Sequence, residues 1–344
     1  MKPTRLDVRR FPSPSRSGVR LVLDAPELAA VESFMTQLVR GAGGRLGQMG
    51  CEQLAGGGKR LRARLALAAA RTLGAREQDA VPWAAAVELL HNATLVHDDV
   101  QDGDRMRRGR ATLWVHHGVA QALNAGDLLL MLPYRAAAGV SGGACAPLCS
   151  LLADYAIATV CGQAAELDLL PAGKIDWASY LDAAAGKTGA MFALPIAGAA
   201  VMAGASLEQA KDLAAPFVDL GTAFQIYDDV LDLYGDKGRE APGSDLYEGK
   251  VSALVVEHLA RRPGDASWLV DLLRAPRETT PAAGVRRAID AFRASGAVAG
   301  AVGRMQAHVD RASATLANAP GLQAIALALA DRCEAPVCEL EGVA

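Results

Sequence analysis

Hydrophobic side chains recur at intervals of three and four residues through most of the chain, whereas the strict alternation that marks a β-strand is scarce. A clear example is the stretch from Pro82 to Asp102, which is rich in alanine, valine and leucine. Pro82 suits the first turn of a helix, because its missing N–H would have no partner there in any case. The pattern predicts an all-α fold of ten or more helices, one of which spans Pro82 to Asp102.

Glycine and proline mark the connections between the predicted helices. They cluster near residues 139–147, 235–249, 262–265 and 275–284. No shift of composition along the chain marks a second domain. We therefore expect a single domain over residues 26–344.

The first twenty residues differ from the rest of the chain in charge. Basic side chains stand here against Asp7 alone, and they are Lys2, Arg5, Arg9, Arg10, Arg16 and Arg20. Pro12 and Pro14 interrupt any helix in this segment. We therefore expect residues 1–25 to form a flexible basic tail, and an organelle-targeting peptide is the alternative.

Composition narrows the class of protein. Of the 344 residues, 51% are hydrophobic and only 5% are aromatic, a mix that favours helices packed closely on helices. The net charge of −3 gives no overall attraction to nucleic acid or to acidic membranes. The apolar stretch 193–205 is shorter than a membrane span and fits a buried helix better. We therefore expect no nucleic-acid partner and no stable membrane insertion.

The cysteines indicate a reducing compartment. None of the six cysteines forms a Cys-x-x-Cys pair of the kind that binds zinc. A chain with this much apolar sequence does not need disulfide bonds to stabilise it. Because no secretory signal is visible either, we expect free thiols and a cytoplasmic protein.

Two acidic motifs of the form Asp-Asp-x-x-Asp begin at Asp98 and Asp228, each at the end of an apolar helical stretch. Asp98 shares a helix face with Asp102, as Asp228 does with Asp232, because residues four apart lie on one side of a helix. Like charges at this spacing repel, so a compensating cation is indicated, and a ligand set of oxygen atoms favours Mg²⁺. A solvated acidic helix end is the alternative for either motif alone. The two together predict a site that holds a diphosphate through Mg²⁺.

Basic side chains lie in settings suited to phosphate. The glycine-rich turn 56–58 leads into a helix whose start carries Lys59 and Arg62 on one face, where anions are favoured. Its spacing is not that of a nucleotide P-loop, so ATP is not indicated, and a solvated helix start is the alternative. Arg107 and Arg108 are adjacent and point in different directions, so they can serve two anions. Further donors compatible with phosphate are Lys187, Thr188, Gln225 and Lys250.

The histidines divide into two groups. His91 lies seven residues before Asp98, on the same helix face, so it is either a substrate ligand or a core residue. His116 and His117 have no comparable setting, and we interpret them as structural.

These motifs give the chain a clear resemblance to the trans-prenyltransferases, the polyprenyl (isoprenyl) diphosphate synthases. The matching segments occur in the family's order: GGGKRLR (56–62), HNATLVHDDVQDGDRMRRG (91–109), AGD (125–127), CGQAAELDL (161–169), GKTG (186–189), FQIYDDVLDLYGD (224–236) and GSDLYEGKVS (243–252). The resemblance implies the all-α isoprenoid synthase fold, a helical bundle around a deep central cavity, and a homodimer.

The resemblance also implies a role for each matched residue. It implies that three Mg²⁺ ions hold the allylic diphosphate and that these ions are bound by Asp98, Asp102 and Asp228. Support for these ions, direct or through water, is implied for Asp99, Asp229 and Asp232. The cations that neutralise the same diphosphate are implied to be Arg107, Lys187 and Lys250. The site for the second substrate, isopentenyl diphosphate, is implied to comprise Lys59, Arg62, His91 and Arg108. Near the reacting carbons, the implied residues are Thr188 and Gln225.

The sequence departs from the family pattern at several positions. Ala63 stands where proline is common, Gly189 where alanine is usual, and Ser252 where threonine is common. A lysine that often follows the second aspartate motif has no exact counterpart, and Lys237 or Arg239 is its candidate substitute. None of these changes removes a predicted metal ligand.

The implied reaction is a Mg²⁺-dependent head-to-tail condensation of an allylic diphosphate with isopentenyl diphosphate. A terpene cyclase is disfavoured, because cyclases lack the paired basic site for a second diphosphate and have a different second metal motif. A non-catalytic subunit of a heteromeric synthase is disfavoured, because such subunits usually lose the metal aspartates.

Product length depends on the helix that carries Asp98, which the resemblance places along the cavity wall. One turn before Asp98, about 5.4 Å deeper, lie Ala93 and Thr94, where a bulky aromatic would stop the product at farnesyl length. These small residues leave the level open. Candidate floors lower down are Leu90, Val87, Met191 and Phe192. We therefore expect a geranylgeranyl or longer diphosphate, with farnesyl diphosphate as the alternative.

Overall fold

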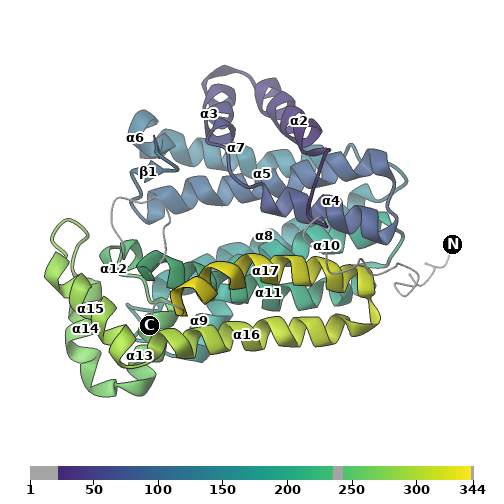
Figure 1. Cartoon of the computed structure of the whole chain (residues 1–344). Coiled ribbons are helices and arrows are strands. Elements are labelled where there is room, and N and C mark those ends of the chain that lie inside the picture. Colours follow the sequence, from purple (N-terminus) through teal and green to yellow (C-terminus); the bar gives the residue numbers. More distant parts are fainter. Residues whose placement is uncertain (1–21, 235–242, 342–344) are drawn as a thin grey trace. The chain divides into compact units, whose positions relative to one another are not determined.

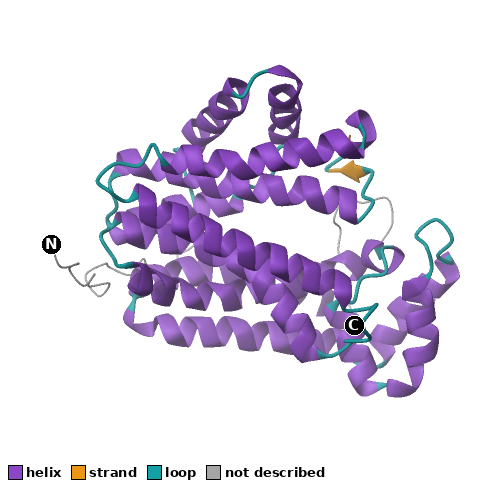
Figure 2. Ribbon diagram, turned by 180° about the vertical axis from the view of Figure 1, so that it is seen from behind, coloured by secondary structure: helices purple, strands orange, loops and turns teal. Residues whose placement is uncertain are grey.

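The computed structural model describes residues 22–234 and 243–341, and within this part the chain is almost wholly helical. Figure 2 shows helices joined by short loops and one small hairpin of two strands. The predicted all-α class is confirmed. Most of the expected basic tail, as well as Lys237 and Arg239, lies outside the described residues.

The chain divides into two compact units, each described here by itself. Unit 1 comprises the described residues up to Ala156, together with Met191–Phe217 and Thr315–Ala328. Its elements are α2 (Leu28–Gly41), α3 (Gly44–Ala55), α4 (Leu61–Leu73), α5 (Glu77–Gln101), β1 (Met106–Arg107), β2 (Arg110–Ala111), α6 (Leu113–His117), α7 (Val119–Ala137), the first half of α8 (Cys145–Asp168), α10 (Ala190–Met202), and the first parts of α11 (Leu207–Tyr234) and α17 (Pro320–Glu341). The prediction of one domain over residues 26–344 stays a prediction.

Helix α5 forms the centre of unit 1 and packs against α4 and α7, as Figure 1 shows. Alanine, valine and leucine on several sides of α5 are buried, so it contacts neighbours around most of its circumference. The fully buried Trp83 donates from Nε1 to the carbonyl oxygen of Pro195 at 3.1 Å. Gly198 lies against the Trp83 ring, and any side chain at this position would overlap the indole.

The predicted start of α5 is wrong. The helix begins at Glu77, so Pro82 is its sixth residue and lies inside the helix. Glu77 and Asp79 occupy the first turn, where the helix dipole favours carboxylates. The polar residues before Pro82 therefore extend the helix by one turn beyond its apolar stretch.

Unit 2 comprises Ile157–Ala190, Val218–Ala314 and the described residues from Leu329. Besides its parts of α8, α11 and α17, it contains α9 (Trp177–Ala184), η2 (Ala185–Gly189), α12 (Ser244–Tyr247), α13 (Ala253–Arg261), η3 (Pro263–Asp265), α14 (Ala266–Arg274), α15 (Ala282–Ala294) and α16 (Ala297–Thr315), and η4 (Leu316–Asn318) follows α16 in unit 1. The backbones of Gly162 in α8 and Gly186 in η2 lie against each other. A Cβ atom at either glycine would overlap the other segment, so only glycine permits this contact.

Within the described residues, two helical stretches are long and apolar enough to cross a bilayer, judged by length and composition alone. They are Cys145–Asp168, of whose apolar stretch 28% is buried, and Trp177–Met202, of which 78% is buried. Buried core helices have the same composition, so this finding is weak evidence for a membrane protein.

Candidate active site

The first aspartate motif lies at the C-terminal end of α5. Asp98 and Asp102 are partly exposed, and the N–H of Asp102 donates to the carbonyl oxygen of Asp98 at 2.8 Å. The carbonyl groups at a helix C-terminus carry partial negative charge, so carboxylates are unfavourable there. A cation bound by Asp98 and Asp102 would offset this repulsion.

Asp99, between these two residues, has a different environment. Its side chain is buried, and Oδ1 accepts from Nε of Arg107 at 2.5 Å. Burial raises the pKa of Asp99 to about 6, although the Arg107 guanidinium opposes the rise. Arg107 also lies 3.7 Å from a carboxylate oxygen of Asp104. These two carboxylates fix the side chain of Arg107 beside the motif.

The hairpin β1–β2 directs Arg107 and Arg108 to different neighbours. Arg108 and Gly109 both have left-handed backbone conformations, with φ of 53° and 74°, as a two-residue hairpin turn requires. Arg107 faces Asp99, whereas the guanidinium of Arg108 donates to the carbonyl oxygen of Gly57. A side chain at Gly58 would overlap the Arg108 guanidinium, so the glycine leaves the space in which the arginine packs against the loop.

The glycine-rich loop is held by a residue that the sequence did not single out. Arg60 is only 5% exposed and has a left-handed φ of 48° at the start of α4. Its guanidinium donates to the carbonyl oxygen of Leu54 at 2.7 Å and to Glu32 at 3.2 Å, and it lies 3.7 Å from the buried carboxylate of Glu88. Of the neighbouring basic residues, Lys59 is exposed and Arg62 is partly exposed. Arg60 is therefore the anchor of the loop.

His91, Arg62 and Arg108 lie close enough for their charges to interact. Burial and then the positive charges of Arg62 and Arg108 hold the pKa of His91 well below its usual range. His91 is therefore a neutral imidazole at neutral pH, able to donate one hydrogen bond to an anion. The Arg62 guanidinium also lies 5.1 Å from the ring centroid of Phe192. Three residues implied for the second substrate are thus brought together within unit 1.

The second aspartate motif lies in the last turns of α11, in unit 2. Asp228 is partly exposed, whereas Asp229 and Asp232 are buried. Asp232 accepts from the backbone N–H of Asp245 at 3.0 Å, which ties α11 to α12. Asp228 is therefore the member of this motif that is most open to a cation.

Asp229 is enclosed by hydrogen-bond donors from three elements. It accepts from the hydroxyl of Tyr180 at 2.7 Å, from the backbone N–H of Ala253 at 2.7 Å and from Nε2 of Gln225 at 3.0 Å. Burial raises the pKa of Asp229 to about 6 against the effect of these donors. Oε1 of Gln225 in turn accepts from the hydroxyl of Thr188 at 2.7 Å. The network orients Thr188 and Gln225, both implied to lie near the reacting carbons.

The two lysines of unit 2 that were predicted to bind phosphate are held by glutamates that the sequence analysis missed. Lys187 lies in the π-helical turn η2, a wide turn frequent at functional sites, and pairs with Glu166 of α8. Lys250 pairs with Glu248 at 2.7 Å, and the Glu248 side chain is 2% exposed. No sequence motif joined Lys187 to Glu166, because the contact depends on the close approach of Gly162 and Gly186.

The donor sets fit a divalent cation and diphosphate. Partly exposed carboxylates occur in both units and offer only oxygen ligands, as Mg²⁺ prefers. Arg107 lies beside the first set, and unit 2 also contains Lys187 and Lys250; these cations suit phosphate oxygens. Each predicted site residue has thus been located within its own unit.

Comparisons with known proteins agree with this chemistry. The sequence model of the family described as "Polyprenyl synthetase" matches residues 45–291. The geranylgeranyl diphosphate synthase of Mycobacterium tuberculosis is 36% identical over 273 residues, 78% of each chain. The octaprenyl diphosphate synthase of Haemophilus influenzae is 34% identical over 248 residues, 71% of this chain and 72% of the relative. A polyprenyl synthase structure from Caulobacter crescentus CB15, complexed with calcium and isoprenyl diphosphate, has a TM-score of 0.80 at 28% identity and covers 92% of this chain and 99% of its own.

Proposed function

Because the chain belongs to the polyprenyl synthetase family and is a prenyltransferase, a polyprenyl diphosphate synthase, we propose that it joins isopentenyl diphosphate head-to-tail to an allylic diphosphate with Mg²⁺. The observation that carries this proposal is the pair of partly exposed aspartates, Asp98 and Asp228, each followed by a buried carboxylate. The buried Asp99 holds Arg107, and the buried Asp229 holds Gln225.

We propose that Asp98, Asp102 and Asp228 hold the metal ions, with Asp229 and Asp232 behind them. Bound divalent ions supply electrostatic stabilisation of the diphosphate as it leaves. Asp99 keeps Arg107 beside the motif, so this arginine is a second source of positive charge for the same diphosphate. Further neutralisation comes from Lys187 and Lys250.

We propose that Lys59, Arg62, His91 and Arg108 bind the diphosphate of the second substrate. The support is the position of His91 near Arg62 and Arg108: burial, and then the positive charges of these arginines, lower the pKa of His91 and keep the imidazole neutral. A neutral imidazole donates a hydrogen bond without the repulsion that a third adjacent cation would bring. The group of residues therefore suits a polyanion better than a single carboxylate.

The proposed reaction needs no covalent enzyme intermediate. The allylic carbon–oxygen bond breaks, and its electron pair leaves with the diphosphate. The double bond of isopentenyl diphosphate then forms the new carbon–carbon bond, and a proton passes to the departing diphosphate. The side-chain oxygens of Thr188 and Gln225, oriented by Asp229, stabilise the positive charge between these steps.

We propose a geranylgeranyl or longer product. Ala93 of α5 is fully buried, and Thr94 turns its hydroxyl to the carbonyl oxygen of His91 at 2.8 Å, so no bulky side chain stands one turn before Asp98. Among the deeper candidates, Phe192 stacks on Arg62. We therefore favour Leu90, Val87 and Met191 as the floor.

Incubation of the protein with farnesyl diphosphate, isopentenyl diphosphate and Mg²⁺, followed by mass analysis of the products, tests the proposed function. We expect diphosphates with twenty or more carbons, extended in five-carbon steps. Chelation of the divalent cation should abolish the reaction. Absence of any condensation with geranyl or farnesyl primers would contradict the activity, whereas condensation that stops at farnesyl diphosphate would contradict only the proposed length.

We further propose a homodimer that acts in the cytoplasm and does not bind nucleic acid. The dimer is supported by large apolar side chains exposed on two helices. They are Val119, Leu123 and Met131 of α7 and Ile157 and Val160 of α8. Exposed apolar groups of this size commonly mark a protein interface.

A further inference from the structure

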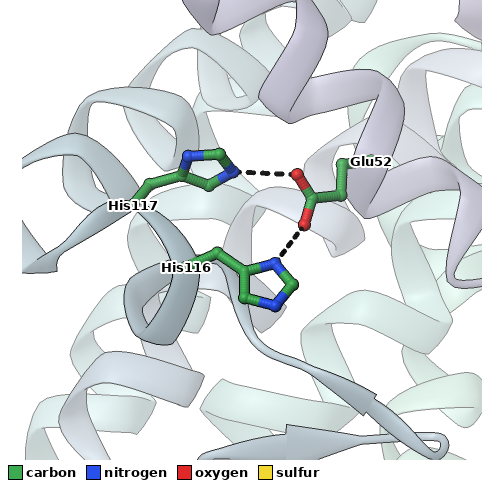
Figure 3. A group of neighbouring side chains, drawn as sticks. All are labelled: Glu52, His116 and His117. Atoms are coloured by element: carbon green, nitrogen blue, oxygen red, sulfur yellow. Dashed lines mark hydrogen bonds and ion pairs between the residues drawn. The ribbon is translucent and has the colours of Figure 1, made fainter.

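A cluster of metal-binding side chains lies outside the proposed active site, between α3 and α6. Glu52 Oε1 lies 2.9 Å from Nδ1 of His116, and Glu52 Oε2 lies 2.8 Å from Nε2 of His117. Figure 3 shows both imidazole rings directed at one carboxylate. The three ligand atoms all lie within 4.8 Å of one another.

The chemistry of this cluster differs from that of the aspartate motifs. Two imidazole nitrogens with a carboxylate form a mixed nitrogen and oxygen set, which favours zinc and neighbouring transition metals over magnesium. The three groups already meet at one point, where a nitrogen of each imidazole lies within hydrogen-bond distance of a carboxylate oxygen.

The geometry is close to that of a bound ion. In a tetrahedral site with zinc about 2.0–2.1 Å from each ligand, the ligand atoms stand about 3.3 Å apart. The two imidazole rings are nearly perpendicular, at 84°, with centroids 6.1 Å apart, so their nitrogens approach the carboxylate from different directions. Small side-chain shifts would admit an ion among the three groups.

We propose that Glu52, His116 and His117 bind one divalent transition metal ion, with Zn²⁺ as the preferred occupant. The side chains of these residues are 37%, 52% and 23% exposed, so an ion can enter from solvent and water can complete its coordination. This site is separate in residues and in ligand chemistry from the proposed magnesium site.

Such an ion would join α3 to α6 close to the basic loop. Glu52 lies one turn before the end of α3, where the carbonyl oxygen of Ala55 accepts from Arg110 at 3.0 Å. Two residues further on, the carbonyl oxygen of Gly57 accepts from Arg108. Zinc would link α6 to the same end of α3 that the hairpin residues Arg108 and Arg110 already contact, and would restrain the loop that carries Lys59.

The proposal is tested by titration calorimetry of Zn²⁺ into the full-length protein, after treatment with a chelator and in excess Mg²⁺. Binding of Co²⁺, followed by visible absorption, gives a second measurement. Excess Mg²⁺ occupies the aspartate motifs. We expect the wild type to bind one Zn²⁺ per chain. This affinity should fall by about tenfold or more in Glu52→Gln and in the double variant His116→Ala/His117→Ala. Zn²⁺ should also slow amide hydrogen exchange in residues 52–58 of the wild type and not of Glu52→Gln.

The neighbouring thiol of Cys51 provides a matched control, since it lies next to Glu52 in sequence and thiolates bind zinc tightly. Cys51→Ser should bind Zn²⁺ as the wild type does. Unchanged Zn²⁺ affinity in folded Glu52→Gln and in the double histidine variant would overturn the proposal, as would loss of binding in Cys51→Ser. Because Glu52→Gln is nearly isosteric, circular dichroism is expected to confirm its fold.

Discussion

Neighbouring carboxylates of one motif have opposite surroundings in this protein. Asp98 and Asp228 are partly exposed, whereas Asp99 and Asp229 are buried and hydrogen-bonded. The outer carboxylates are open to a cation, and the inner ones orient an arginine and a glutamine. One short motif thus combines an open carboxylate with a buried carboxylate that orients a neighbouring side chain.

The outer carboxylates are expected to be essential to turnover. Asp98→Asn or Asp228→Asn should lower the turnover number by about a hundredfold or more, because each removes charge that stabilises the leaving diphosphate. Steady-state kinetics at saturating Mg²⁺, with circular dichroism, measures this loss. Asp154→Asn is the control, since this exposed carboxylate pairs with Lys211 and belongs to neither aspartate motif. Full turnover of a folded Asp98→Asn protein would refute the assignment.

Glu257 gives a pH-dependent prediction away from the proposed active site. Burial would raise its pKa, but hydrogen bonds from Arg261, Trp177 and Arg304 prevail and lower it from the ordinary 4.5. Because the pKa of Glu257 is lower in the folded protein, the ionised carboxylate stabilises the fold above pH about 4.5. This stabilisation is lost as the pH falls through the folded-state pKa. Glu257→Gln should therefore reduce the free energy of unfolding by about 1–3 kcal/mol at pH 7. Denaturant titrations should show this difference shrinking in acid, and a constant difference would contradict it.

At the scale of elements, the contact between α8 and η2 depends on two glycines. Gly162→Ala should destabilise the protein by about 1–3 kcal/mol, because the new methyl group would overlap the backbone of Lys187. Gly303→Ala is the matched control in the exposed interior of α16, where nothing lies within 4 Å of the added carbon. The control should gain about 0.5–1 kcal/mol. Thermal unfolding compares the two, and equal effects would argue against the close contact.

Helix α5 is expected to act as a ruler for product length. Ala93→Phe should shorten the product, because it places an aromatic ring one turn before Asp98, where the alanine is fully buried. Product masses from farnesyl and isopentenyl diphosphates measure the change. Leu89→Phe is a control for overpacking, since it enlarges a buried residue of α5 that is not among the proposed floor positions. Unchanged products from a folded Ala93→Phe protein would count against the ruler.

At the scale of the whole molecule, the proposed dimer makes a prediction about mass in solution. The double variant Leu123→Arg/Met131→Arg should run as a monomer, because it replaces two apolar side chains of α7, which are 41% and 54% exposed, with charged ones. Light scattering after gel filtration measures the mass. Leu327→Arg is the control, since it charges an equally exposed leucine on α17. A monomeric wild type, or a double variant that stays dimeric, would exclude this interface.

The sequence by itself determined the helical class, the family and the identity of the charged residues. Three- and four-residue periodicity reports helices directly, and the family match confirmed the polyprenyl synthase interpretation. The start of α5 was misplaced, because polar residues in a first turn carry no apolar signal.

Only the tertiary structure decided how these residues are paired. Asp99 and Asp229 stand directly after Asp98 and Asp228 in motifs of identical pattern, so spacing does not show which carboxylate is buried. Their burial depends on the neighbouring segments that cover them. The anchoring of Arg60 by Glu32, and the approach of His116 and His117 to Glu52, join residues far apart in the chain. Periodicity describes one helix at a time, whereas pairing depends on how packed helices bring distant side chains within hydrogen-bond distance. The candidate metal ligands could therefore be proposed from the sequence, but the contacts of the buried aspartates and the Glu52 cluster could not.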